Sequence, residues 1–302
     1  MRYGSMLLDV QRPGRYEGVE AGAVVKEWAK VDVKVALAFP DTYEIGMSHL
    51  GLQILYEILN DLPWVAAERC YAPWPDMEAL LREKGLPLLT RESGRSPNDF
   101  DLLGFTLQYE LSATNVLTML DLSGIPLNRE ARGEDAPIVM GGGPVASNPE
   151  PYADFFDAFF IGEAEEGIVE IAGVLREAKA KGLDRAARLR ALRSVEGVYL
   201  PDEYLPIYDG GHFAGFATPE GGAPKKVRRR IVADLTKIPP PRRPMVPFGE
   251  TVHERLAVEV TRGCTRGCRF CQAGYLYRPV REREPGALLS SIRDELAVTG
   301  HE

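Results

Sequence analysis

Short apolar runs alternate with segments of helical spacing along residues 31–182, and this alternation limits the possible folds more than any other feature of the chain. Residues 31–39 are apolar and rich in β-branched side chains, which is typical of a buried strand. Apolar residues then recur at helical spacing over residues 46–60. The same reasoning predicts further strands at residues 68–71, 101–107, 137–140 and 157–161, and helices at residues 76–84, 111–122 and 163–181. The sequence therefore predicts an α/β fold with a flavodoxin-like, doubly wound parallel sheet.

The pattern changes after this region and divides the chain into four parts. Residues 1–30 form a polar lead-in without a clear period, and residues 31–182 form the predicted sheet domain. Residues 183–250 begin with a short helix, continue as aromatic and glycine-rich pieces that predict a small β connector, and end as a basic, proline-rich linker. Residues 251–302 are expected to contain a new strand, a cysteine-rich loop and a helix.

Three of the four cysteines fall within eight residues, directly after a strand predicted over residues 256–261. Cys264, Cys268 and Cys271 have the spacing C-x-x-x-C-x-x-C, which places three thiolates on one short loop. The disulfide frameworks of secreted proteins use dispersed cysteines, so this grouping indicates cofactor ligation in a reducing compartment. Iron–sulfur sites generally use four cysteines, and three leave one iron open to bind another molecule.

A zinc site is the alternative for these cysteines. Structural zinc takes four ligands, and the chain offers only the distant Cys70 and the upstream His253 as a fourth. Neither position gives a usual zinc spacing, so the sequence favours an iron–sulfur cluster. Phe270 is expected to shield this cluster, and Arg262 is expected to add positive potential around it.

The cysteine loop, with an aromatic residue before its last cysteine, resembles that of the radical S-adenosylmethionine (SAM) superfamily. The resemblance implies that Cys264, Cys268 and Cys271 ligate a [4Fe-4S] cluster whose open iron binds SAM. An electron from a donor such as a flavodoxin or ferredoxin would then release a 5′-deoxyadenosyl radical. The resemblance also implies a partial TIM barrel, of which residues 251–302 hold only the first strand–helix unit. We therefore expect either a fragment or a second polypeptide that carries the rest of the barrel. For these 302 residues alone we expect poor cluster assembly and no turnover.

The sheet domain resembles the cobalamin-binding domain of many radical SAM proteins, which carries the motif D-x-H-x-x-G after its first strand. Asp41 and Gly46 match this motif, Tyr43 stands where the histidine would ligate cobalt, and His49 is out of register. The resemblance also implies a cofactor contact from Thr106. Further contacts are implied for the loop glycines Gly141, Gly142, Gly143 and Gly162. The sequence leaves the binding of cobalamin undecided, because a phenol can lie beneath cobalt without ligating it and the glycines are equally suited to tight turns.

Stretches over most of the chain resemble one uncharacterised subgroup of radical SAM proteins with such an N-terminal domain. The resemblance implies no particular substrate. These stretches are residues 12–16, 39–56, 71–77, 104–111 and 148–151. Residues 108–110 follow the third strand and are expected to face a ligand cleft. Glu163, Glu165 and Glu166 open a predicted helix, where negative charge is favourable without any catalytic role.

Charge is distributed unevenly along the chain. Residues 225–283 contain 15 Lys/Arg and 5 Asp/Glu, whereas the remainder contains 21 Lys/Arg and 39 Asp/Glu. The basic segment predicts an anionic partner such as RNA, and the alternative is that its arginines pair with the acidic sheet domain. No apolar run approaches the length that crosses a bilayer, so we expect no membrane association and a cytoplasmic location.

Three functions follow from these features. The first is a radical SAM enzyme, or its N-terminal part, in which cobalamin, if bound, relays a methyl group. The second is a non-catalytic module that binds cobalamin or a partner and carries a remnant cluster loop. The third is electron transfer by a cluster with a labile iron.

Overall fold

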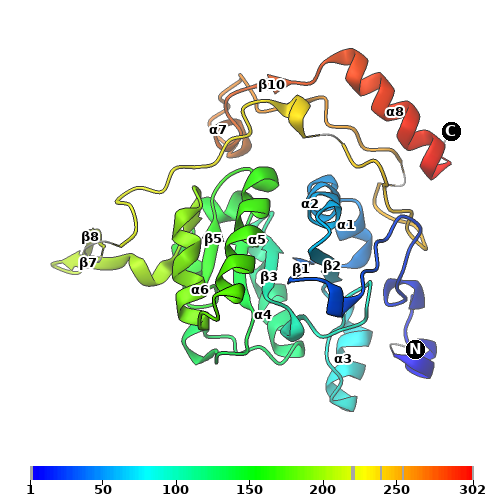
Figure 1. The fold of residues 1–302 in the computed structure, drawn as a ribbon, viewed down its shortest axis with the longest axis horizontal. Coiled ribbons are helices and arrows are strands. Elements are labelled where there is room, and N and C mark those ends of the chain that lie inside the picture. The colour runs from blue at the N-terminus through cyan, green and yellow to red at the C-terminus, as the bar shows by residue number, and fades with distance from the viewer. Residues whose placement is uncertain (1–2, 219–221, 239, 254, 301–302) are drawn as a thin grey trace.

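The centre of the protein is a six-stranded sheet (Figure 1). The computed structural model describes residues 3–218, 222–238, 240–253 and 255–300. The strands lie in the order β2-β1-β3-β4-β5-β6, and all neighbours are parallel except β6, which pairs antiparallel with β5. The strands are β1 (Val33–Phe39), β2 (Val65–Tyr71), β3 (Leu102–Thr106), β4 (Ile138–Gly142), β5 (Ala158–Phe160) and β6 (Val198–Tyr199). The order of the first five strands confirms the predicted flavodoxin-like arrangement.

Helices cover both faces of this sheet because its strands are apolar on both sides. In β1, Val35 and Leu37 pack against α2, α5 and α6, whereas Ala36 and Ala38 face α3 and α4. The helices are α1 (Tyr43–Met47), α2 (Leu50–Asp61), α3 (Pro75–Lys84), α4 (Ala113–Leu122), α5 (Ala164–Ala180) and α6 (Arg185–Ala191). The helix predicted over residues 46–60 is therefore two helices, and His49 caps the start of the second.

The remaining elements lie outside the sheet. A hairpin of β7 (Leu205–Asp209) and β8 (His212–Ala217) projects from one side of the molecule (Figure 1). The segment that follows arches over the carboxyl ends of the parallel strands (Figure 1). It contains β9 (Thr261–Arg262), α7 (Ala273–Leu276), β10 (Arg281–Glu282) and α8 (Pro285–Thr299).

Two sequence expectations need correction. The strand predicted over residues 256–261 is wrong in extent, because only Thr261–Arg262 form a strand, and their partner is the equally short β10. A longer strand needs a neighbour to receive its backbone hydrogen bonds, and no other described strand lies beside this one. The strand at Val198–Tyr199, expected in the connector, instead extends the central sheet. The predicted helix near residues 285–298 is confirmed as α8.

Among the described residues, no helix combines the length and the apolar character that crossing a bilayer requires.

A buried ion-pair network ties the N-terminal lead-in to the sheet. Glu20 binds Arg69 of β2 at 2.7 Å and Arg91 at 2.6 Å, and the side chains of Glu20 and Arg69 are completely buried. Arg69 also binds Glu92 at 2.7 Å. Burial alone would raise the pKa of Glu20, but the two guanidinium groups outweigh it and lower that pKa. The lead-in is therefore part of the core.

We predict that Glu20→Ala destabilises the protein by about 3–5 kcal/mol, because it leaves buried guanidinium charge undercompensated. Urea unfolding followed by circular dichroism measures this change. Glu27→Ala is the matched control, since Glu27 pairs with Lys30 on the surface, where both side chains are more than 70% exposed. We expect that variant to lose less than about 1 kcal/mol, and equal losses in the two variants would contradict the prediction.

Candidate functional site

A cavity of 440 Å³ lies at the carboxyl end of the parallel strands, where ligands of doubly wound sheets bind. Its floor is formed by the strand ends and its roof by residues 259–263 and Tyr277 of the C-terminal segment. The roof includes Gly263, the residue before Cys264. The cysteine loop therefore begins at the edge of the cavity.

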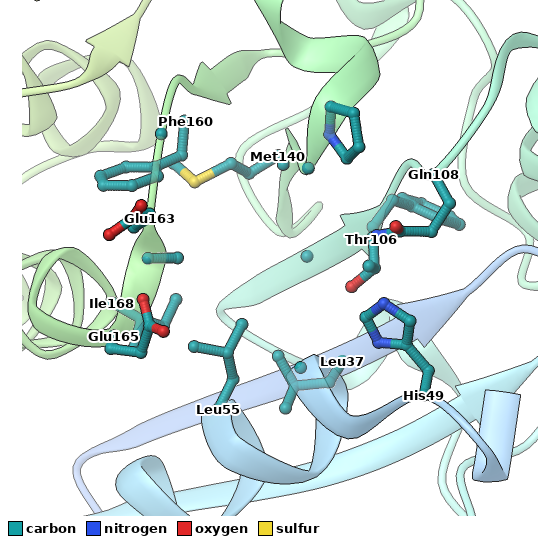
Figure 2. A pocket seen from close by; sticks show the side chains of 18 of the residues that line it. Leu37, His49, Leu55, Thr106, Gln108, Met140, Phe160, Glu163, Glu165 and Ile168 are labelled. Atoms are coloured by element: carbon teal, nitrogen blue, oxygen red, sulfur yellow. The ribbon is translucent and has the colours of Figure 1, made fainter. Parts of the chain in front are cut away.

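Most of the cavity wall is apolar. Leu37, Met140 and Phe160 come from β1, β4 and β5, and Leu55 and Ile168 come from α2 and α5 (Figure 2). These side chains lie on the sheet face that packs against α2 and α5, so the cavity continues the hydrophobic core toward the roof.

Polar side chains enter the cavity from two opposite sides (Figure 2). His49, Thr106 and Gln108 lie together on one side, and Glu163 and Glu165 lie on the other. Within the described part of the chain, the Thr106 hydroxyl has no hydrogen-bond partner. An apolar pocket with a few polar groups is the usual form of a small-molecule site.

The position of His49 fixes the protonation state of its ring. Its Nδ1 accepts a hydrogen bond of 3.0 Å from the backbone N–H of Leu52, which makes His49 the N-cap of α2. Burial lowers the pKa of His49, and a hydrogen bond with Gln108 only partly opposes this shift. In the neutral ring one nitrogen donates and the other accepts, so Nε2 carries the proton. Gly51 leaves room for the ring, because a Cβ there would lie 2.9 Å from it.

Glu163 joins the sheet domain to the cavity roof. It immediately follows the loop after β5, and its side chain is only 4% exposed. Arg281 of β10 binds both of its oxygens at 2.6 Å, and Arg262 of β9 lies 3.3 Å from one of them. The backbone N–H of Val232 also donates to it at 2.8 Å. Burial is the largest influence and raises the pKa of Glu163, but the hydrogen bonds from Arg281 and Val232 and the charges of Arg262 and Arg281 together outweigh it, so the net pKa is lowered.

Further ion pairs complete this network. Arg262 binds Glu165 at 2.6 Å and Glu259 at 2.8 Å, and Arg283 binds Glu259 at 2.9 Å. Three arginines and three glutamates thus compensate one another around β9 and β10. We define these six residues as the clamp: Glu163, Glu165, Glu259, Arg262, Arg281 and Arg283. Arg262 was expected beside a cluster, but its side chain points into the clamp instead.

The cysteine loop lies outside the clamp. Cys264, Cys268 and Cys271 form no disulfide and are partly or fully exposed to solvent. The backbone N–H of Arg266 approaches the Cys264 sulfur at 3.4 Å. Phe270 was expected to shield the cluster, but its side chain is 93% exposed and is not packed against other described residues. Across the described residues, no three possible ligands converge into a closed metal site.

The candidates for a fourth zinc ligand lie elsewhere. Cys70 is fully buried in β2, and burial raises its pKa to about 12, so it is not a thiolate at neutral pH. His253 lies near α1, where its backbone N–H donates to Ser48. Among the described residues, neither Cys70 nor His253 joins the three cysteines in a group that could hold a metal ion.

The predicted cofactor residues separate into two groups. Thr106, Gly142, Gly143 and Gly162 line the cavity, as does Gln108. Asp41, Tyr43 and Gly46 are not among the residues that line it. Tyr43 is buried against Tyr71, and its hydroxyl accepts a hydrogen bond from the backbone N–H of Phe248 at 3.2 Å.

The loop glycines are explained mainly by contacts within the protein. A Cβ at Gly143 would lie 2.6 Å from the Leu107 carbonyl oxygen, and one at Gly162 would lie 2.3 Å from the Arg230 carbonyl oxygen. A Cβ at Gly141 would meet Phe159 at 2.9 Å. Only Gly142 leaves open space toward the cavity, with its nearest neighbour 4.0 Å away. The tight-packing alternative therefore accounts for Gly141, Gly143 and Gly162.

Many arginines of the basic segment pair with carboxylates. Those that do so are Arg230, Arg242, Arg243, Arg262, Arg281 and Arg283. Their partners include Glu57 and Asp61 of α2 and Glu166 and Glu170 of α5. This pairing favours the alternative in which the segment binds the acidic sheet domain.

Sequence reasoning missed the roles of His49 and Glu163. His49 was set aside because it is out of register with the cobalamin motif, and histidine is not among the residues whose presence signals an N-cap. Glu163 was attributed to the helix dipole. No sequence signal reveals its pairing, because Arg281 lies more than one hundred residues away.

Comparison with known proteins connects these features to a family. The family described as "Radical SAM proteins, N-terminal" matches residues 51–201, which is half of the chain. An uncharacterized protein of Methanocaldococcus jannaschii is 25% identical over 258 residues, which cover 84% of this chain and 44% of that protein. The chain thus spans less than half the length of this curated relative.

We predict that His49 is neutral and protonated on Nε2 at pH 7. Long-range ¹H–¹⁵N correlation spectra of the histidine rings distinguish the two tautomers directly. His49→Asn should keep the helix cap, because an asparagine side chain accepts the same backbone hydrogen bond, and it should remove the ring signal. A ring protonated on Nδ1 would contradict the prediction.

We predict that Glu163→Gln loosens the roof without unfolding the sheet. Loss of one partner from a buried ion pair costs about 3–5 kcal/mol, so hydrogen exchange over residues 259–283 should accelerate by roughly a hundredfold or more. Exchange in β1 should not change. Because the pKa of Glu163 is lowered, the clamp is intact at neutral pH and should weaken as the pH falls through that pKa.

Glu166→Gln is the matched control for this variant, since Glu166 is 41% exposed and its partner Arg230 also binds Glu170. Hydrogen exchange measured by mass spectrometry should be unchanged in this control over residues 259–283. Equal exchange rates in Glu163→Gln and the unmodified protein would show that the clamp does not hold the roof.

Proposed function

The chain belongs to the family of radical SAM proteins, N-terminal, and we propose that it is the N-terminal part of an enzyme whose Cys264, Cys268 and Cys271 ligate a [4Fe-4S] cluster. The observation that supports this proposal most directly is the state of the three thiols. They lie on one loop, form no disulfide and face solvent, whereas the fourth thiol of the chain is buried. Family membership and this donor set point to the same chemistry.

The cysteine loop suits a cluster in its donors and in its backbone. Thiolates are the usual ligands of iron–sulfur clusters, and a set of three leaves one iron for SAM. The N–H group of Arg266 near the Cys264 sulfur is of the kind that tunes a cluster when it is bound. Such a cluster supplies the electron that cleaves SAM to a 5′-deoxyadenosyl radical.

The residues of this chain would position the loop rather than take part in the chemistry. Gly263 has a φ of +97°, and a Cβ there would lie 2.6 Å from the Tyr277 carbonyl oxygen, so only glycine fits before Cys264. Arg262 and Arg281 face each other in the β9–β10 pair and bind Glu163 from both strands. The clamp would thus fix where the cysteine loop starts.

Other parts of the function stay predictions. An electron donor such as a flavodoxin or ferredoxin would reduce the cluster, and further barrel strands, in a longer chain or a second polypeptide, would complete the SAM site. Cobalamin remains a prediction from resemblance alone, since Tyr43 does not line the cavity. A non-catalytic binding module and an electron-transfer protein are the competing functions.

Anaerobic reconstitution with iron and sulfide tests the proposal. In a protein that also contains the remaining barrel strands, we predict four irons and four sulfides per chain, as the cluster type requires, and an electron paramagnetic resonance signal of the reduced cluster that changes when SAM is added. Open coordination at one iron is the reason for that change. These 302 residues alone should assemble the cluster poorly. Cleavage of SAM to 5′-deoxyadenosine is expected in a protein that also contains the remaining barrel strands.

The triple variant Cys264→Ala/Cys268→Ala/Cys271→Ala should bind no cluster, and Cys70→Ala is the matched control that should bind it normally. Equal iron retention in the triple variant and the unmodified protein would refute the ligand assignment. A cluster whose spectrum is indifferent to SAM would favour electron transfer, and a stable protein without any cluster would favour the non-catalytic module.

A further inference from the structure

The cavity beneath the cysteine loop combines apolar walls with uncharged polar groups on one side and the paired carboxylates of the clamp on the other. We propose that it is the binding site of a small uncharged molecule that has an apolar body and one oxygen-bearing end. Its volume of 440 Å³ lies in the range of small-molecule sites, which is about 300–1,000 Å³. This site is formed by the residues of the cavity alone and does not require a bound cluster.

The charge of the lining indicates that the ligand is uncharged. The carboxylates that line the cavity are Glu163, Glu165 and Glu259, and each one binds an arginine of the clamp. The lining arginine, Arg262, binds all three of them. No described charge of the lining is therefore left for a ligand. A phosphate, a carboxylate or the zwitterion of SAM would enter this cavity without a counter-charge, which is unfavourable.

The polar end of the cavity is organised by a chain of hydrogen bonds. The N–H of Leu52 donates to His49 Nδ1, so the neutral ring carries its proton on Nε2. Gln108 lies beside the ring (Figure 2), and we infer that its amide oxygen faces the Nε2 proton, which leaves its NH₂ group to donate elsewhere. The Thr106 hydroxyl lies beside Gln108 (Figure 2). Neither the NH₂ group of Gln108 nor the Thr106 hydroxyl donates to another residue that the structure describes.

These donors require an acceptor on the ligand. A carbonyl, amide or hydroxyl oxygen accepts from both an amide N–H and a threonine hydroxyl. Polar groups in a largely apolar site are normally satisfied when the ligand is bound, and they fix its orientation. The oxygen of the ligand is thus expected to lie between Thr106 and Gln108.

The rest of the cavity suits an apolar body. Leu37, Leu55 and Phe160 are apolar side chains of the lining, and two glycines keep the floor open. A Cβ at Gly104 would have its nearest neighbour at 3.9 Å, and one at Gly142 at 4.0 Å. Both glycines lie in strands at the floor, so larger side chains there would extend into the cavity.

The same hydrogen bonds make His49 unsuitable as a ligand of cobalt. A histidine binds a metal through an unprotonated nitrogen, and the unprotonated nitrogen of His49 is the one that accepts from Leu52. A corrinoid in this cavity would therefore have to break the cap of α2 or bind without His49. Binding of hydroxocobalamin is the competing outcome of the test below.

Equilibrium dialysis with 2-naphthol, an apolar two-ring molecule with one hydroxyl group, tests the site in the 302-residue chain. We expect saturable binding of one molecule per chain. Naphthalene should bind about threefold to tenfold more weakly, because it lacks the oxygen. 2-Naphthoate should bind more than roughly tenfold more weakly, because its carboxylate finds no free cation. The triple cysteine variant should bind 2-naphthol as the unmodified protein does.

Thr106→Val removes one donor with little change in shape. It should weaken the binding of 2-naphthol by about threefold to tenfold and leave the affinity for naphthalene unchanged. Thr114→Val, at an exposed position on α4, is the matched control and should change neither affinity. Gly104→Val should weaken the binding of both molecules, because its side chain would fill the floor of the cavity.

Three outcomes would overturn the proposal. The first is the absence of saturable 2-naphthol binding, and the second is an unchanged affinity in both Thr106→Val and Gly104→Val. The third is one-to-one binding of hydroxocobalamin that Gly104→Val abolishes, because the cavity would then hold a corrinoid. Loss of cysteine-dependent iron with intact 2-naphthol binding would refute the proposed cluster and leave this site standing.

Discussion

The arrangement of the cavity and of the cysteine loop depends on one buried carboxylate, Glu163. It lies just after β5, at the carboxyl edge of the sheet, and binds arginines from both strands of the short β9–β10 pair. Two residues per strand provide few backbone hydrogen bonds, so that pair has little stability of its own. The ion pairs rather than the strand pairing therefore determine where the roof of the cavity lies.

A buried ion pair contributes to position more than to stability. Removing charges from water is costly, and their mutual attraction offsets that cost only when every group is paired in good geometry. In the clamp every charge is paired, because Arg281 binds both oxygens of Glu163 and the remaining four charges also have partners. Among the described residues, the Nε of Arg283 is the only buried polar side-chain atom of the clamp that has no hydrogen-bond partner. A displaced roof would leave at least one charge buried and unpaired, which favours a single position.

The fold of residues 31–182 could be predicted because its signals are local. Buried strands such as β1 and amphipathic helices such as α5 carry their period in their own residues, and the parallel order follows from their alternation. The strand expected over residues 256–261 was wrong in extent because a strand also needs a neighbour, which its own sequence does not reveal. The grouping of the three cysteines is equally local, since all three lie within eight residues, and their role as a ligand set stays a prediction.

The rest of the site was hidden because its contacts join residues that are distant in sequence. Glu163 meets Arg281 across 118 positions, and Gly162 packs against the backbone of Arg230. Glycines of that kind are indistinguishable in sequence from glycines that admit a ligand. The two kinds differ only in the space around the Cβ position. A Cβ at Gly142 would have its nearest neighbour at 4.0 Å, whereas one at Gly143 would lie 2.6 Å from the Leu107 carbonyl oxygen.

The loop after β1 shows how similar sequence patterns can place different chemistry at a cavity. Asp41 and Gly46 match a cobalamin motif, yet Tyr43 lies in the core, where a Cβ at Gly46 would collide with Tyr71. The side chain that reaches the cavity from this region is His49, and it does so as the cap of α2. A ring held through Nδ1 can donate through Nε2 but cannot offer that nitrogen to a metal. The cap therefore leaves the neutral ring of His49 with a proton on Nε2 rather than with a lone pair that could bind a metal.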